Sequence, residues 1–182
     1  KIPLLETVFR SRPAGTFVNI EIKTALKNDR IWRQLVRPLT GYPALETGQS
    51  PAREAEARRV AAATAECIRT VARDIPELPR YIIVSSFDPV AIASFGAEMP
   101  GVPLGFLHCG SVHYDTRPMM KTIAHQAWHP HWREAKPALV SAAHEGGQRV
   151  NCWTVNSGKL ASRLAGMRVD GIITNVPDAM LK

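Results

Sequence analysis

The sequence lacks the features that mark several classes of protein. No run approaches the roughly 18 consecutive apolar residues that a membrane-spanning helix needs. Its three cysteines, Cys67, Cys109 and Cys152, form neither a Cys-x-x-Cys pair nor a zinc-finger spacing, so we expect free thiols rather than a disulfide framework. There is no G-x-G-x-x-G string and no P-loop string, which removes the best marker of a nucleotide-binding sheet.

What remains is an ordinary globular composition with a basic excess. The 182 residues are 45% hydrophobic and 21% charged, which suits one domain over residues 1–182. The net charge of +7 is scattered, and the helix-like stretch 53–74 interleaves arginines with glutamates as a solvated helix face does. We therefore expect no nucleic-acid partner, although a basic balance also suits steering of an anionic small molecule. The compartment and the oligomeric state stay open.

The hydrophobic periodicity predicts strands that alternate with helices. Strands are expected at 17–23, 81–87, 102–108, 127–131, 149–155 and 171–174, and helices at 2–12, 52–73, 89–97, 119–125, 134–144 and 158–165. Such alternation without a hairpin signal indicates parallel strands in βαβ units, either in an open doubly wound sheet or in a barrel. Without a nucleotide-binding string, the barrel fits better. We predict an α/β fold, a (β/α)₈ TIM-type barrel of which strands three to eight are present.

One strand carries an unusual polar row. In the segment 17–23, Asn19, Glu21 and Lys23 point to one side and the intervening aliphatic residues to the other. In a barrel the aliphatic row faces the helices, so the polar row faces the interior, with Glu21 and Lys23 at the carboxyl-end mouth where such barrels keep their sites. Burying both charges costs several kcal/mol unless they are paired or coordinated. Two interpretations follow: a structural ion pair, or a metal-binding glutamate beside a phosphate-binding lysine, which we favour.

Five motifs in order resemble those of the glycerophosphodiester phosphodiesterase family. They are NIEIK within 17–23, SSFD within 84–88, HPHW within 128–132, VNCWTVN within 149–156 and GIITNVP at 171–177. Each is weak to moderate alone, whereas their order and spacing along the whole chain are specific.

The resemblance implies a site. Glu21 would be one of three carboxylate ligands of a divalent cation, Ca²⁺ or Mg²⁺, which take oxygen ligands. Lys23 would act in catalysis by holding a phosphate oxygen of the substrate. Phe87 and Trp153 would line the pocket against the glycerol or the leaving alcohol; the alternative for both is ordinary core packing.

The histidines give a weaker signal. His129 and His131 have the spacing at which two side chains on one strand share a face, as in some zinc sites, but no third ligand follows at a convincing spacing. The resemblance places them at the barrel rim, which favours pocket lining or a structural role. The four histidines with no partner pattern are expected to be surface or satisfied core residues: His108, His113, His125 and His144.

The sequence departs from the family pattern in two places. Asn175 stands where the family often has aspartate. The family's opening His-Arg-Gly, Glu-x-Asp and His-Asp strings do not occur; they would supply two catalytic histidines, a phosphate-binding arginine and two metal ligands. We therefore expect an N-terminally incomplete barrel domain that lacks about two units, each of ~30 residues.

The resemblance implies the function of the intact protein. We expect a phosphoric diester hydrolase of lipid and glycerol metabolism, a metal-dependent enzyme that converts small-molecule glycerophosphodiesters to sn-glycerol 3-phosphate and an alcohol. The 182-residue chain alone is expected to be inactive. Two alternatives stay open: a phospholipase-D-like relative that acts on sphingolipid or lysophospholipid headgroups, and a degenerate barrel without catalysis.

Overall fold

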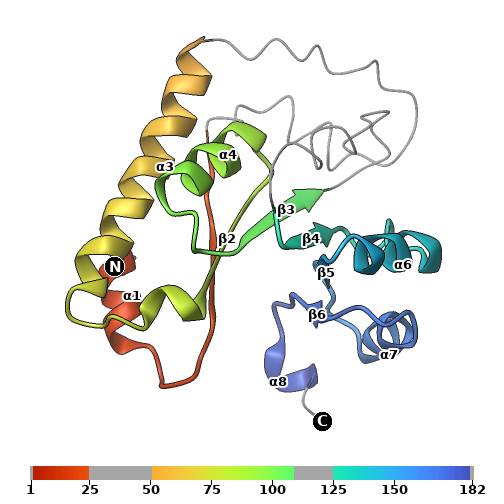
Figure 1. Cartoon of the computed structure of the whole chain (residues 1–182). Helices are drawn as coiled ribbons and strands as arrows, with labels where there is room; N and C mark the ends of the chain where they lie inside the picture. The colour runs from red at the N-terminus through yellow and green to blue at the C-terminus, as the bar shows by residue number, and fades with distance from the viewer. Residues whose placement is uncertain (1, 25–50, 109–124, 181–182) are drawn as a thin grey trace.

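The strands of the protein form one parallel sheet that curls into a half-barrel. The computed structural model describes residues 2–24, 51–108 and 125–180. Neighbouring strands follow the chain, from β1 to β6 (Figure 1). The strands are β1 (Val18–Glu21), β2 (Ile82–Ser86), β3 (Leu104–His108), β4 (Ala127–Pro130), β5 (Arg149–Cys152) and β6 (Gly171–Ile172), and all five pairings are parallel. The predicted α/β barrel architecture is confirmed.

Helices cover the outer face of the sheet because the outward side chains of the strands are aliphatic. They are α1 (Leu5–Ser11), α3 (Pro51–Ala72), α4 (Pro89–Glu98), α6 (Pro137–Glu145), α7 (Gly158–Gly166) and the short α8 (Pro177–Met180), with a 3₁₀ turn η2 (Leu78–Tyr81) before β2. Ile22 of the first strand segment is 4% exposed, and Val18 and Ile20 pack against the same cluster. This confirms that the aliphatic row of residues 17–23 faces the helices.

Two hydrophobic clusters hold the helical layer to the sheet. The first joins α3 and α4 to β1, β2 and β3, and the second joins α6 and α7 to β4 and β5. In α3 the buried residues Ala57, Ala61 and Ala65 recur at one-turn spacing, and these small side chains let the helix approach its neighbours closely. Burial of apolar area, at about 25 cal/mol per Å², is the main stabilising term of such a layer.

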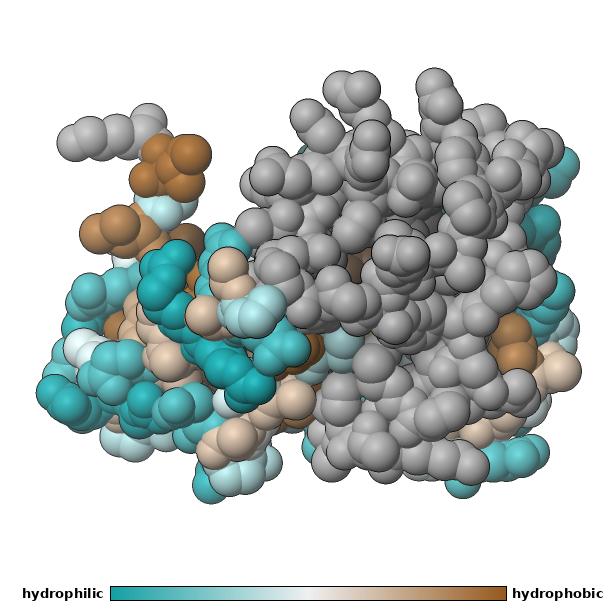
Figure 2. Space-filling view, turned by 90° about the horizontal axis from the view of Figure 1, so that it is seen from above, coloured by the Kyte–Doolittle hydropathy of each residue, from teal (hydrophilic) through white to brown (hydrophobic). Residues whose placement is uncertain are grey.

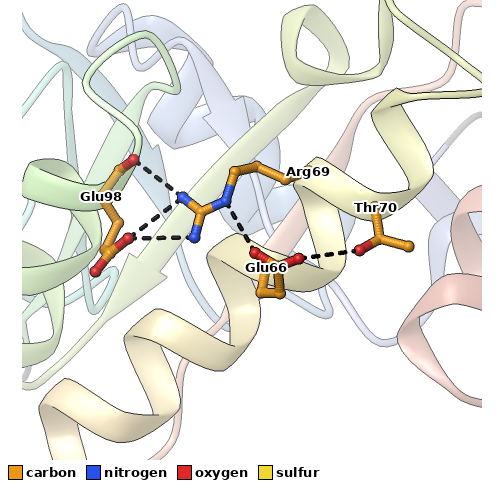
Figure 3. Close-up of polar contacts among 4 residues, drawn as sticks. All are labelled: Glu66, Arg69, Thr70 and Glu98. Atoms are coloured by element: carbon orange, nitrogen blue, oxygen red, sulfur yellow. Dashed lines mark hydrogen bonds and ion pairs between the residues drawn. The ribbon is translucent and has the colours of Figure 1, made fainter.

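An arginine bridges the two long helices at the surface. Arg69 of α3 donates from Nε to Glu66 on the same helix at 3.2 Å, and from its Nη atoms to Oε2 of Glu98 at the end of α4 at 3.2 and 3.3 Å (Figure 3). The side chain of Arg69 is 40% exposed, so we expect no more than about 1 kcal/mol from each pair. The helices are held by their apolar faces, and the arginine sets their register.

The predicted elements within the described residues are present, and two helices begin at polar residues of the kind that favour a cap. Asp88 is the N-cap of α4, and its carboxylate accepts from the Val90 N–H at 2.9 Å. Ser157 occupies the N-cap position of α7 but its side chain makes no capping hydrogen bond, and the side chain of Asn156, the other candidate cap, bonds the loop after β6. The long connection at 25–50, most of the predicted helix at 119–125, Cys109 and His113 lie outside the described residues.

The described surface is mostly polar, with apolar side chains concentrated in the first segment. On the face in Figure 2, hydrophilic residues cover most of the coloured surface and hydrophobic ones form smaller groups. Ile2, Leu4 and Phe17 are 95%, 73% and 69% exposed; the first two precede α1, and Phe17 directly precedes β1. Among the described helices, none combines the length and apolar character that a bilayer crossing requires.

Candidate functional site

A layer of polar side chains fills the inside of the half-barrel. Ser85 of β2 donates to Oδ1 of Asn19 on β1 at 2.9 Å, and the Asn151 amide nitrogen on β5 lies 2.9 Å from Nε2 of His129 on β4. Ser85 and His129 are fully buried, at 0% and 1% exposure. We call these four residues the floor. Their hydrogen bonds compensate the desolvation of groups that an apolar interior would not tolerate.

Glycines make room for the larger floor residues. A Cβ atom at Gly105 of β3 would lie 2.6 Å from Cε1 and 2.8 Å from Nε2 of the His129 ring, and one at Gly171 of β6 would collide with the Asn151 side chain. Interior layers of such barrels pack large against small side chains, and here the imidazole and the amide take the space that the glycines leave.

We predict that Gly105→Ala destabilises the fold by about 2 kcal/mol, because the added methyl group overlaps a ring that is itself fixed by a hydrogen bond. Gly101→Ala is the matched control, since nothing lies within 4 Å of a Cβ at that exposed position. Urea denaturation of both variants measures the difference. Equal midpoints for the two variants would show that the His129 ring is not held where the structure has it.

An aromatic wall lies one level closer to the carboxyl ends of the strands. Phe87, His131 and Trp153 each follow a floor residue by two positions and so point to the same side. The rings of Phe87 and Trp153 meet edge to face at 5.3 Å, although β2 and β5 are separated by two strands, and the rings of Trp153 and His131 also meet edge to face, at 5.2 Å. The indole N–H donates to the His129 carbonyl at 2.8 Å. The wall therefore spans the interior directly above the floor.

Glu21 and Lys23 come together at the end of β1. The Lys23 Nζ lies 3.5 Å from Oε2 of Glu21, and their side chains are 51% and 32% exposed. The expectation that both charges would be buried is wrong, because the interior is open beside β1. An ion pair this exposed contributes at most about 1 kcal/mol to the free energy of unfolding. Stabilisation of the fold therefore does not by itself explain why a glutamate and a lysine lie here.

The backbone around Lys23 is anchored on both sides. The Ser86 hydroxyl donates to the Ile22 carbonyl at 2.7 Å, and the Thr24 hydroxyl donates to Oδ2 of Asp88 at 2.8 Å. Thr24, Ser86 and Asp88 are all buried. The carboxylate that begins α4 thus also fixes the end of the first strand segment, and Lys23 extends from a rigid stretch of chain.

Histidines in the interior are held in the neutral form. Burial, with a smaller contribution from nearby His125, lowers the pKa of His129 from 6.5 to about 4. Burial also lowers the pKa of His131. The two rings point to the same side, yet they belong to different levels: His129 is bound by Asn151, and His131 packs between Trp132 and Trp153.

The remaining described histidines have partners, as expected for surface or satisfied core residues. His108 pairs with Glu134, His144 lies 2.8 Å from Oδ2 of Asp170, and His125 contacts Gln148 at 2.6 Å. Burial alone would raise the pKa of Asp170, but the Val150 N–H and His144 outweigh it and lower the pKa. Cys67 and Cys152 are free thiols, and burial raises the pKa of Cys152 to about 11.

The loop after β6 is tied to the loop after β5. The Asn156 side chain accepts from the Asn175 backbone N–H at 2.9 Å and from the Thr174 hydroxyl at 3.1 Å. Asn175 takes part through its backbone, which an aspartate would supply equally well. The departure from the family pattern at this position therefore leaves this contact intact.

The described donors could hold part of a cation site. The Glu21 carboxylate is a hard oxygen donor at the mouth, which suits Ca²⁺ or Mg²⁺. Within residues 2–24, 51–108 and 125–180, no three acidic, histidine or cysteine side chains gather closely enough to hold a metal ion. One ligand fits the chemistry of a hard cation, and the described part of the chain does not complete its coordination.

The sequence indicated the wall residues Phe87 and Trp153 and two residues of the floor, Asn19 and His129, but not the other two. Phe87 and Trp153 were predicted as pocket residues, and they meet each other over the interior. The roles of Ser85 and Asn151 were not predicted. Their signal was a polar residue at an inward position of an otherwise apolar strand, the pattern that had identified Asn19 and Glu21.

The sequence matches a known protein family over most of its length. Residues 42–179 match the model of the Glycerophosphoryl diester phosphodiesterase family. A glycerophosphodiester phosphodiesterase of Bacillus altitudinis is 34% identical over 103 residues, which are 56% of this chain and 42% of that protein. The matched region thus spans less than half the length of that relative.

Solved structures share the fold. A glycerophosphodiester phosphodiesterase from Thermotoga maritima superposes with a TM-score of 0.61 at 18% identity, over 96% of this chain and 60% of that one. A phosphodiesterase from Oleispira antarctica, solved with its product sn-glycerol-3-phosphate, gives a TM-score of 0.59 at 19% identity over 70% of this chain and 50% of that one. At these identities the likeness establishes the fold.

Proposed function

Because the chain belongs to the glycerophosphoryl diester phosphodiesterase family, we propose that the whole protein hydrolyses glycerophosphodiesters to sn-glycerol 3-phosphate and an alcohol with the help of a divalent cation. The proposal is supported by the arrangement of side chains at the mouth of the half-barrel. An aromatic wall crosses the interior there, and a lysine and a glutamate lie together at the end of β1. Carboxyl ends of parallel barrel strands are where such enzymes keep their sites.

Lys23 is proposed to bind a phosphate oxygen. Its ammonium group is half exposed, and among the described residues its carboxylate partner is Glu21, 3.5 Å away, so an incoming anion can reach it without breaking a strong pair. A lysine acts on phosphate as a flexible point charge, and positive charge beside the phosphoryl group stabilises the charge that develops during transfer.

Glu21 is proposed as one ligand of the cation, Ca²⁺ or Mg²⁺. When bound, such an ion would neutralise phosphoryl oxygens and orient the substrate. Within this chain, Glu21 supplies one oxygen ligand and keeps the neighbouring lysine oriented. Phe87 and Trp153 are proposed to contact the glycerol or the leaving alcohol, since their rings form an apolar surface above the floor.

The function is tested by following sn-glycerol 3-phosphate release from glycerophosphoethanolamine by the whole protein, coupled to glycerol-3-phosphate dehydrogenase. We expect turnover that a chelator abolishes and that Ca²⁺ or Mg²⁺ restores. Lysophosphatidylcholine serves as the comparison substrate and is followed by choline release, because phospholipase-D-like cleavage yields choline and lysophosphatidic acid rather than sn-glycerol 3-phosphate. Turnover of the lysophospholipid alone would favour a phospholipase-D-like relative, and turnover of neither would favour a barrel without catalysis.

A further inference from the structure

Beyond the wall, the aromatic stacking continues to a basic cluster at the rim of the barrel. Trp132 directly follows His131, and its backbone N–H donates to the Trp153 carbonyl at 2.9 Å. The guanidinium carbons of Arg133 and Arg163 lie 5.0 and 5.7 Å from the centre of the Trp132 ring. We call Trp132, Arg133 and Arg163 the rim cluster. It joins the end of β4 to helix α7, at the carboxyl-end side of the sheet.

Some arginines of the described residues are held by carboxylates, whereas the rim arginines are held by an aromatic ring. Arg10, Arg58 and Arg69 each lie between 2.8 and 3.6 Å from a carboxylate. In the described part of the chain, neither Arg133 nor Arg163 has an ion-pair partner, and both are exposed. An indole face orients a guanidinium but leaves its N–H groups to the solvent. Two oriented cations therefore offer donors to an anion.

The charges of neighbouring residues also favour binding of an anion at the rim cluster. Glu134, the residue after Arg133, turns to His108, and helix α7 (Gly158–Gly166) carries Lys159 and Arg163 but no acidic residue. The rim beside β4 and β5 is therefore a basic surface. Guanidinium groups bind phosphate well because their planar fork matches its oxygens.

A continuous row of rings connects this surface to the site. The Trp153 ring meets the His131 ring edge to face with their centres 5.2 Å apart, and the His131 ring contacts the tilted Trp132 ring with their centres 5.4 Å apart. If the leaving alcohol lies against Trp153, as the proposed function has it, an alcohol several bonds long extends along these rings and ends at the two arginines.

We propose that the rim cluster binds a second phosphate carried by the alcohol part of the substrate, so that the protein prefers glycerophosphodiesters of phosphorylated alcohols. This inference rests on the proposed function, and it names the substrate class of the same site.

A matched pair of substrates tests the inference. For the whole protein, we expect kcat/KM for glycerophosphoinositol 4-phosphate to exceed that for glycerophosphoinositol roughly tenfold, because the two compounds differ in one phosphate that two arginines can bind. Arg133→Gln and Arg163→Gln are each expected to lower this ratio roughly fivefold. Arg80→Gln is the control: it removes an exposed arginine from η2 at the opposite end of the strands, and the ratio should not change.

Calorimetric binding of the same two compounds separates this inference from the proposed function. If neither is hydrolysed, the proposed function fails, while a binding preference that both arginine variants lose still supports the phosphate site. Equal kcat/KM and equal affinity for the two compounds would overturn the inference. So would arginine variants that keep the preference but lose binding to vesicles of phosphatidylglycerol and phosphatidylcholine, since the cluster would then be a lipid-docking surface.

Discussion

Replacing Glu21 with glutamine is expected to lower kcat/KM of the whole protein roughly a thousandfold on glycerophosphoethanolamine, because loss of the proposed cation ligand would remove about 4 kcal/mol of transition-state stabilisation. The shape of the side chain is kept while its charge is lost. The free energy of unfolding should change by less than about 1 kcal/mol, since the side chains of the Glu21–Lys23 ion pair are 32% exposed for Glu21 and 51% for Lys23. Coupled turnover assays and thermal denaturation measure the two effects.

Glu66→Gln is the matched control for this substitution. Glu66 also lies in a surface ion pair, 3.2 Å from Arg69, but on α3 in the outer helical layer (Figure 3). We expect a similar small change in stability and unchanged turnover. Full activity in the Glu21 variant, with a stability loss like that of the control, would show that Glu21 is only a structural partner of Lys23.

The fold is expected to lose up to about 3 kcal/mol of stability between pH 6.5 and pH 4 through His129 alone. The folded-state pKa of about 4 lies below the ordinary value of 6.5, so in this window the unfolded chain binds a proton that the folded chain refuses. This contribution is complete above pH 6.5 and is lost as the pH falls. Burial of His131, which lowers its pKa too, acts in the same direction.

Urea denaturation across this pH range measures the acid slope in the wild type and in His129→Gln. The variant lacks the titrating group, so its free energy of unfolding should depend less steeply on pH between 6.5 and 4, whatever its absolute stability. A variant slope as steep as that of the wild type would mean that the acid sensitivity originates elsewhere and that His129 is not buried neutral.

The sequence predicted the architecture because the relevant signals are local. The alternation of the aliphatic side chains Val18, Ile20 and Ile22 predicted which side of the strand faces the helices. The polar row at Asn19 and Glu21 could be assigned to the interior by the same period. These patterns need only the neighbouring residues of one element.

Features that depend on pairing across strands could not be predicted. The fit of His129 against Gly105 joins two strands through a register that the sequence does not state. The stacking of Arg163 on Trp132 joins residues about thirty positions apart in sequence, and Asn156 turned from the expected helix cap to the loop after β6. In each case a tertiary contact competes with the local preference of the residue.

We propose that the whole protein cleaves the bond between the phosphate and the alcohol of a glycerophosphodiester. Phosphorus NMR of glycerophosphoethanolamine incubated with the whole protein and Mg²⁺ or Ca²⁺ tests it most directly, because the product spectrum identifies the bond that breaks. We expect the phosphodiester signal to be replaced by that of sn-glycerol 3-phosphate, while the ethanolamine that is released carries no phosphorus and gives no signal. Formation of phosphoethanolamine and glycerol, or an unchanged substrate signal with either cation, would contradict it.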